Sequence, residues 1–291
     1  MLIYSNGCSH TEGGYVSKTY DEILAELVFD STEYVSKKIS RIDTDSIKNY
    51  DLLISSLKSH QVSGKNILCK NATAGKGNFL IFKETYAFVT KCITNDVNID
   101  YIVIQTSGPN RKYIPTWDGS YDDVTPDDGN NEILFEPWGT LETIQWVYLL
   151  QKLFLEHNIP YVFIPYMEYD SESYNISPYT DLIDWDKFTT NPLEGHRNKF
   201  RYNIDLVVDV HGHPSIYGNM ELVKQCINIL KLDVILKSID NYYGEMEIRE
   251  STKKDEFTRM FLKEYSHELR AAGETRLNRL INSFKNKINT K

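Results

Sequence analysis

The sequence predicts an α/β fold, in which helices cover both faces of a mostly parallel sheet and a helical segment follows the sheet. Four short apolar runs have the length of buried strands, and the stretches between them are long enough for helical crossovers. The runs lie at residues 2–4, 66–69, 100–105 and 161–164. After about residue 232 such runs cease and charged residues dominate. We therefore expect an α/β domain over residues 1–231 and a charged helical extension over 232–291.

Helices are predicted where apolar residues recur every three or four positions. The expected helices cover residues 20–28, 50–57, 79–94, 140–157 and 215–230, and Thr140 is expected to cap the fourth. Two stretches rich in turn-forming and aromatic residues, 107–139 and 166–205, are expected to be irregular insertions, the second with a short helical piece near 182–188. Long irregular loops often line a binding site.

The C-terminal segment 255–287 contains no proline, and its apolar residues recur at helical spacing. This pattern predicts one or two helices, interrupted near Ala272 and Gly273, that pack on the domain or on another molecule. The segment is therefore a candidate surface for a protein partner or for self-association.

Composition narrows the class of protein. The 291 residues are 41% hydrophobic and 25% charged, as is usual for soluble globular proteins. A net charge of −9, from 32 basic and 41 acidic residues, disfavours a general nucleic-acid binder. No apolar run reaches the roughly 20 residues of a membrane span, and the N-terminus lacks the pattern of a signal peptide. With four scattered cysteines, we expect reduced thiols and a cytoplasmic protein without membrane or nucleic-acid partners.

The most informative motif follows the first predicted strand, in the segment Gly7-Cys8-Ser9-His10. Small residues allow a sharp turn there, so that the hydroxyl of Ser9 stands clear of the sheet and its backbone N–H lies near a helix start. A nucleophilic serine needs both features, because the same amide can hold the oxyanion that its attack creates.

A complementary motif lies near the other end of the domain, in Asp209-Val210-His211-Gly212-His213-Pro214-Ser215. A histidine in this segment can accept the proton of Ser9, and a nearby carboxylate can orient it. The loops that carry Ser9, Gly75 and Ser107 each follow a predicted strand. In parallel sheets such loops share one edge, where the active site forms.

These residues resemble the SGNH (GDSL-like) hydrolase family, in the Gly-Cys-Ser version of bacterial and phage-encoded members. Residues 1–230 follow the order of the family's blocks, which implies a flavodoxin-like three-layer α/β/α fold and an esterase with Ser9 as nucleophile and His213 as base. The second block resembles residues 71–78, with Gly75 in the place of the glycine whose amide helps to hold the oxyanion.

Two blocks depart from the family pattern. The loop Gln105-Thr106-Ser107-Gly108-Pro109-Asn110-Arg111 matches the third block poorly, so that either Asn110 or Asn78 takes the role of side-chain oxyanion donor. In the last block the acid position holds Val210, and Asp209 lies one residue further away. Either Asp209 reaches His213 through an altered turn, or the site is a serine–histidine dyad.

The predicted function is hydrolysis of a short-chain O-acyl ester, such as a carbohydrate ester, through an acyl-enzyme on Ser9 and without a cofactor. One alternative is an acyltransferase that uses the same serine, and another is a catalytically silent binding or assembly module. A third is a zinc site, because Cys8, His10, His211 and His213 are suitable ligands if their loops meet.

Overall fold

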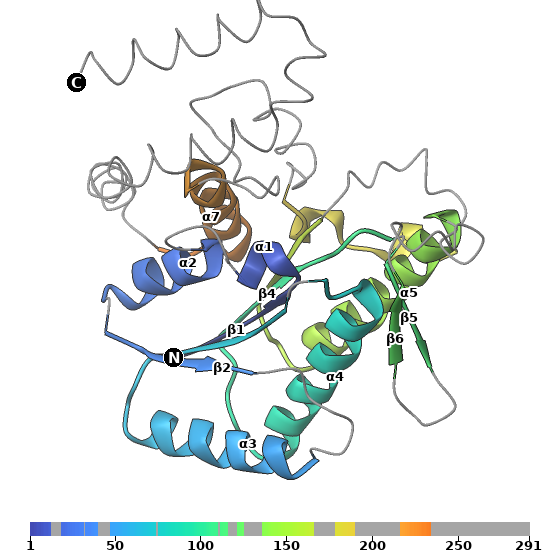
Figure 1. Ribbon diagram of the computed structural model, residues 1–291. Coiled ribbons are helices and arrows are strands. Elements are labelled where there is room, and N and C mark those ends of the chain that lie inside the picture. The colour runs from blue at the N-terminus through green and yellow to red at the C-terminus, as the bar shows by residue number, and fades with distance from the viewer. Residues whose placement is uncertain are drawn as a thin grey trace, which may run out of the picture.

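The computed structural model describes residues 1–12, 19–31, 33–39, 47–73, 75–109, 111–115, 121–124, 136–165, 178–189 and 216–233. It confirms the α/β fold, with a parallel five-stranded sheet in the order β2-β3-β1-β4-β7 (Figure 1). The strands are β1 (Leu2–Gly7), β2 (Val35–Lys38), β3 (Ile67–Ala72), β4 (Tyr101–Gln105) and β7 (Tyr161–Ile164).

The strand order explains where a site can form. When β2 is left out, the other four strands of this sheet, counted along the chain, are arranged in the order second, first, third, fourth, as in flavodoxin-like folds. The chain leaves β1 toward β3 on one side and later returns to β4 on the other. This reversal at β1 is the switch point beside which ligands bind in doubly wound sheets.

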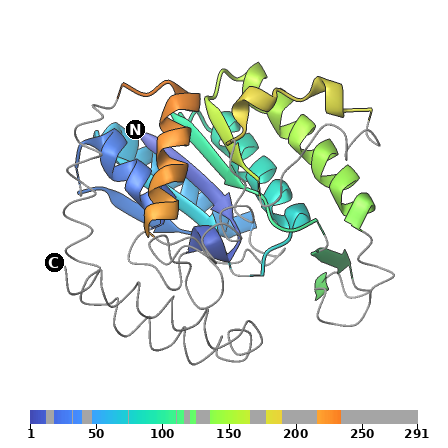
Figure 2. The same cartoon turned by 90° about the horizontal axis from the view of Figure 1, so that it is seen from above.

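Helices cover both faces of the sheet. α3 (Ile47–Val62), α4 (Asn78–Thr94) and α5 (Glu136–Glu156) lie on one face, and α2 (Tyr20–Phe29) and α7 (Ile216–Leu230) lie on the other (Figures 1 and 2). Both faces of β1 and β3 are therefore buried along their whole length, which is why each strand begins with three consecutive apolar residues rather than an alternating pattern.

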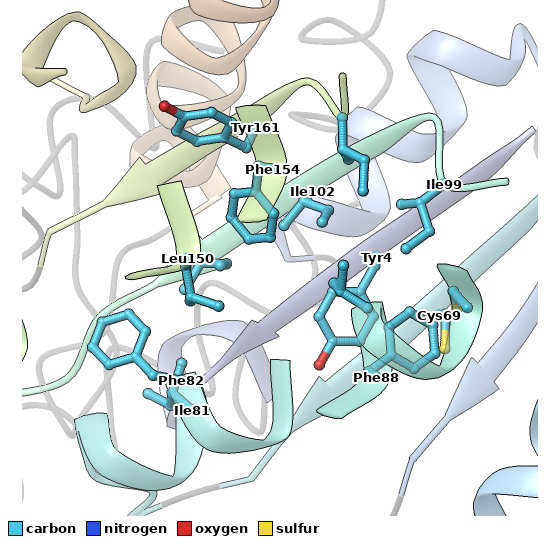
Figure 3. Packing of buried hydrophobic residues seen from close by; sticks show 14 of the residues in the cluster. Tyr4, Cys69, Ile81, Phe82, Phe88, Ile99, Ile102, Leu150, Phe154 and Tyr161 are labelled. Atoms are coloured by element: carbon cyan, nitrogen blue, oxygen red, sulfur yellow. The ribbon is translucent and has the colours of Figure 1, made fainter. Parts of the chain in front are cut away.

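The larger core cluster lies under α3, α4 and α5. Tyr4 of β1 stacks on Phe88 of α4, with ring centroids 4.2 Å apart, and Phe154 of α5 packs on Tyr161 of β7 (Figure 3). On the opposite face Val103 and Val162 pack with the apolar residues of α2 and α7. Each large side chain buried in this way stabilises the fold by about 1.5–3 kcal/mol.

Three local predictions need correction. The polar stretch after residue 30 contains the short edge strand β2, whose side chains are alternately half-buried and exposed. The stretch 107–139 is not wholly irregular, because β5 (Lys112–Pro115) and β6 (Tyr121–Val124) pair as an antiparallel hairpin. Lastly, α5 begins at Glu136, so Thr140 lies inside the helix and does not cap it.

The early start of α5 has a physical basis. Pro137 occupies the first turn, where the missing N–H of proline has no helical partner to lose. Gly139 then lies directly against the backbone of Pro109, and a Cβ at this position would collide with the Pro109 carbonyl. The glycine lets α5 approach the loop after β4.

The other helices and strands expected within the described residues are present, while most of the expected insertion 166–205 lies outside them. The short 3₁₀ helices η2 (Thr180–Leu182) and η3 (Trp185–Lys187) occur where a helical piece was predicted. Residues 234–291 lie outside the described residues, so the C-terminal extension and the domain division stay predictions. In the described ranges, no helix combines the length and apolar character needed to cross a membrane.

Candidate active site

The loops that carry the predicted site residues leave the sheet at one edge. Gly7 at the end of β1 pairs with Ala72 of β3, and Gln105 at the end of β4 pairs with Ile164 of β7. Asn6 also pairs with Ile104, which sets β1 and β4 in register. The segments after β1, β3 and β4 therefore start side by side at the carboxyl ends of the strands.

A tight turn joins β1 to the helical turn α1 (Ser9–Glu12). The backbone N–H groups of Thr11 and Glu12 both donate to the Cys8 carbonyl at 3.0 Å, so Ser9 is the first residue of this turn. Gly7 is required before it, because a Cβ there would collide with the hydroxyl of Thr11 and meet Oε1 of Gln105.

Gln105 holds this turn from the neighbouring strand. Its Oε1 accepts hydrogen bonds from the Cys8 amide at 3.2 Å, the Cys8 thiol at 3.1 Å and the Thr11 hydroxyl at 3.2 Å. The residue is fully buried. The sequence analysis did not identify Gln105; the available signal was a polar side chain at the end of the apolar run Ile102-Val103-Ile104.

A second set of contacts links α1 to the start of α7. The hydroxyls of Thr11 and Tyr20 lie 2.7 Å apart, and the backbone N–H of Tyr20 donates to Oδ1 of Asn219 at 3.1 Å. Burial raises the pKa of Tyr20 well above its usual value, so this phenol stays protonated. Asn219 lies in the first turns of α7, which begins at Ile216, three residues after His213.

The loop after β3 carries Gly75, whose φ of +79° is readily adopted only by glycine. The next residue, Lys76, anchors the loop to the sheet below it. Its Nζ donates to Glu84 Oε2 at 2.7 Å, to Asn71 Oδ1 at 3.0 Å and to Asn6 Oδ1 at 3.2 Å. The sequence analysis did not identify Lys76; a lysine between two glycines after a strand was the only signal.

Asn78 at the start of α4 clamps the loop after β4. Its Oδ1 accepts a hydrogen bond from the Ser107 amide at 2.6 Å. Its Nδ2 donates to the Ser107 carbonyl and to the Thr143 hydroxyl, both at 2.9 Å. Both amide hydrogens of Asn78 are thus engaged, and the side chain joins α4, α5 and the β4 loop.

A second buried polar cluster holds the start of α2 to the sheet. Ser5 donates to Asp21 at 2.6 Å, and Lys70 contacts Asp21 at 3.4 Å and Glu22 at 3.2 Å. Burial raises the pKa of Glu22, but Lys70 and the hydrogen bonds from Thr19 outweigh that effect and lower it overall. α2 therefore begins at a defined position beside the Ser9 turn.

The described residues include part of the predicted constellation. The backbone of Ser9, together with Gly75 and Asn78, lies at the carboxyl edge, whereas Asp209, His213 and Asn110 lie outside the described residues. Their predicted roles therefore stay predictions. The zinc alternative depends largely on side chains that are not described, and the described residues contain no cluster of three or more metal-binding side chains.

Comparison with known proteins leaves the family open. No protein-family model matches the chain. No curated protein matches it either. One similar solved structure is that of LAE5, an alpha/beta hydrolase enzyme from the metagenome of Lake Arreo, Spain. The two share 12% identity with a TM-score of 0.35, over 79% of this chain and 95% of the other. A likeness at this level carries no argument about family or activity.

Proposed function

We propose that the protein is a serine esterase of the SGNH type, with Ser9 as nucleophile and His213 as general base. The observation that supports it most is the contact path Thr11–Tyr20–Asn219. It ties the turn that Ser9 opens to the helix that begins three residues after His213. Two chain segments about 200 residues apart thereby meet at the switch point of the sheet.

In the proposed reaction the Ser9 hydroxyl attacks the ester carbonyl while His213 accepts its proton. His213 then protonates the leaving alcohol, and water releases the acyl group from Ser9. Asp209 orients the histidine if it reaches the ring; otherwise the site works as a dyad. No step requires a cofactor.

The amides of Ser9 and Gly75 are the proposed backbone donors to the oxyanion. Among the described residues, the N–H of Gly75 takes part in no hydrogen bond, so it is available to a substrate. Such a donor contributes about 3 kcal/mol to transition-state stabilisation. The anchored Lys76 keeps Gly75 in place, so that its N–H does not have to move when the oxyanion forms.

The proposed substrate is a short-chain ester of a ring-bearing alcohol such as a carbohydrate. Trp138 supports this choice, because it is 65% exposed at the start of α5, next to the contact between Gly139 and the Pro109 loop. An exposed indole next to the contact with the loop after β4 offers an apolar face for a sugar ring.

The test is labelling of the full chain with a fluorophosphonate probe, together with turnover of p-nitrophenyl acetate. We expect the probe to modify Ser9, and Ser9→Ala to abolish both labelling and turnover. Ser55→Ala is the matched control, because Ser55 is an exposed helical serine that bonds to the Asp51 carbonyl of its own helix. Failure of the probe to label the wild-type protein would contradict the proposed esterase activity and favour the catalytically silent binding module. Acyl transfer to an added alcohol in preference to water would indicate an acyltransferase.

A further inference from the structure

The loop after β4 contains a buried hydroxyl without a hydrogen-bond partner. Ser107 is fully buried, and within the described part of the chain its Oγ has no hydrogen-bond partner. A hydroxyl removed from water and left unpaired destabilises a protein, so such groups are rare and usually have a functional reason.

Ser107 lies at the edge of the sheet where the candidate site forms. The N–H of Thr106 still donates to the Ile164 carbonyl at 2.9 Å, so the pairing between β4 and β7 continues beyond Gln105. In extended chain, residues two apart project to the same side. Gln105 projects toward the Cys8–Ser9 turn, where it binds the Cys8 amide, and Ser107 is two residues further along.

The backbone of Ser107 is fixed, whereas its hydroxyl is not. Asn78 accepts a hydrogen bond from the amide of Ser107 and donates one to its carbonyl, and it donates its second amide hydrogen to the Thr143 hydroxyl. Asn78 therefore has no hydrogen left for a substrate unless this clamp opens. The hydroxyl of Ser107 has a hydrogen that no described residue accepts.

We propose that Ser107 is a catalytic residue whose hydroxyl donates a hydrogen bond to the oxyanion formed when Ser9 attacks the ester. This inference rests on the proposed function. The hydrogen stays on Ser107 throughout, and only the negative charge on the former carbonyl oxygen is stabilised. A fixed donor that gains its acceptor only during the reaction favours the transition state over the ground state.

The first test compares Ser107→Ala and Ser107→Thr in the full chain, with p-nitrophenyl acetate as substrate. Ser107→Ala should lower kcat by about 10- to 1000-fold with little change in KM, since the contact forms only in the transition state. Its melting temperature should be equal to or above that of the wild type, because no hydrogen bond of the resting protein is lost. Ser107→Thr keeps the hydroxyl and should retain most of the activity.

A matched control is Thr90 in the last turns of α4, whose Oγ1 is also buried and finds no hydrogen-bond partner among the described residues. Thr90→Val should leave kcat unchanged and the melting temperature equal or higher. The same pair of variants can be compared after phosphonylation of Ser9, which mimics the tetrahedral oxyanion. Labelling should raise the melting temperature less in Ser107→Ala than in Thr90→Val.

Wild-type kcat in Ser107→Ala would overturn the inference. A loss of kcat that accompanies a melting temperature several degrees lower, in both Ser107 variants, would overturn it too, because that pattern indicates a purely structural role. Full activity in Ser9→Ala would instead refute the proposed function itself, whatever the Ser107 variants show.

Discussion

Nζ of Lys76 lies 2.7 Å from Oε2 of Glu84, and the lysine side chain is only 1% exposed. The same ammonium group binds the side chains of Asn6 in β1 and Asn71 in β3. A single cation therefore joins two strands and α4 directly below the loop that carries Gly75. Because the charge is compensated on several sides, its burial is tolerated, and the loop is held rigidly.

Removal of one partner from this pair should be costly. We expect Lys76→Met to lower the free energy of unfolding by about 3–5 kcal/mol, because Glu84 is left as a buried, uncompensated carboxylate. Urea denaturation followed by circular dichroism measures the loss. The control is Lys91→Met, which breaks the exposed pair with Asp51 and should cost less than about 1 kcal/mol. Equal effects of the two variants would show that the Lys76 pair does not anchor the fold.

Replacement of Gln105 tests the hold on the nucleophile turn. Gln105→Leu keeps the size of the side chain but leaves the Cys8 amide and the Thr11 hydroxyl without their acceptor. We expect a loss of about 1–3 kcal/mol in unfolding free energy and slower fluorophosphonate labelling. Gln61→Leu is the matched control, since Gln61 makes exposed contacts to Asn98 that water can replace. Labelling at the wild-type rate in Gln105→Leu would contradict this role.

The cysteines should be unreactive in the native protein. Burial raises the pKa of Cys92 and Cys226 to about 12, and it raises that of Cys69 as well. At pH 8 only about one thiol in ten thousand with such a pKa is ionised. We expect slow reaction of these thiols with Ellman's reagent in buffer and rapid reaction of all four cysteines in denaturant. Fast modification of Cys92 or Cys226 without denaturant would contradict their burial.

Acid should weaken the contact between α2 and β3. The folded-state pKa of Glu22 lies below its ordinary value of 4.5, so its contribution to stability is complete above that value and is lost as the pH falls through the lowered pKa. Glu22→Gln should therefore be less stable than the wild type near neutral pH, and the difference should shrink in acid. Urea titrations of both proteins at about pH 7 and about pH 3 measure this difference in the free energy of unfolding. A stability difference between the variant and the wild type that is the same at both pH values would refute the ion pair with Lys70. Glu33→Gln, at an exposed position, is the reference variant.

Part of the structure follows from short-range patterns in the sequence. The runs that end at Gln105 and Ile164 are apolar because helices cover both faces of β4 and β7, and the helices over 20–29 and 78–94 show regular apolar spacing. The edge strand β2 was not predicted, because its side chains are only half-buried or exposed, and Val35 is its one apolar residue. The start of α5 depends on a contact between Gly139 and Pro109, thirty positions apart.

By itself the sequence determined the class of fold and marked Ser9 and Gly75 as residues of turns that follow strands. Periodicity and the conformational freedom of glycine are local properties, and a chain displays them before it folds. Only the tertiary structure decided that Gln105 would hold the Ser9 turn, that Lys76 would become a buried cation, and that Asn78 would hydrogen-bond to the backbone of Ser107. These roles depend on which polar groups meet in the interior, and that is set by strand order and helix packing rather than by neighbours in the chain.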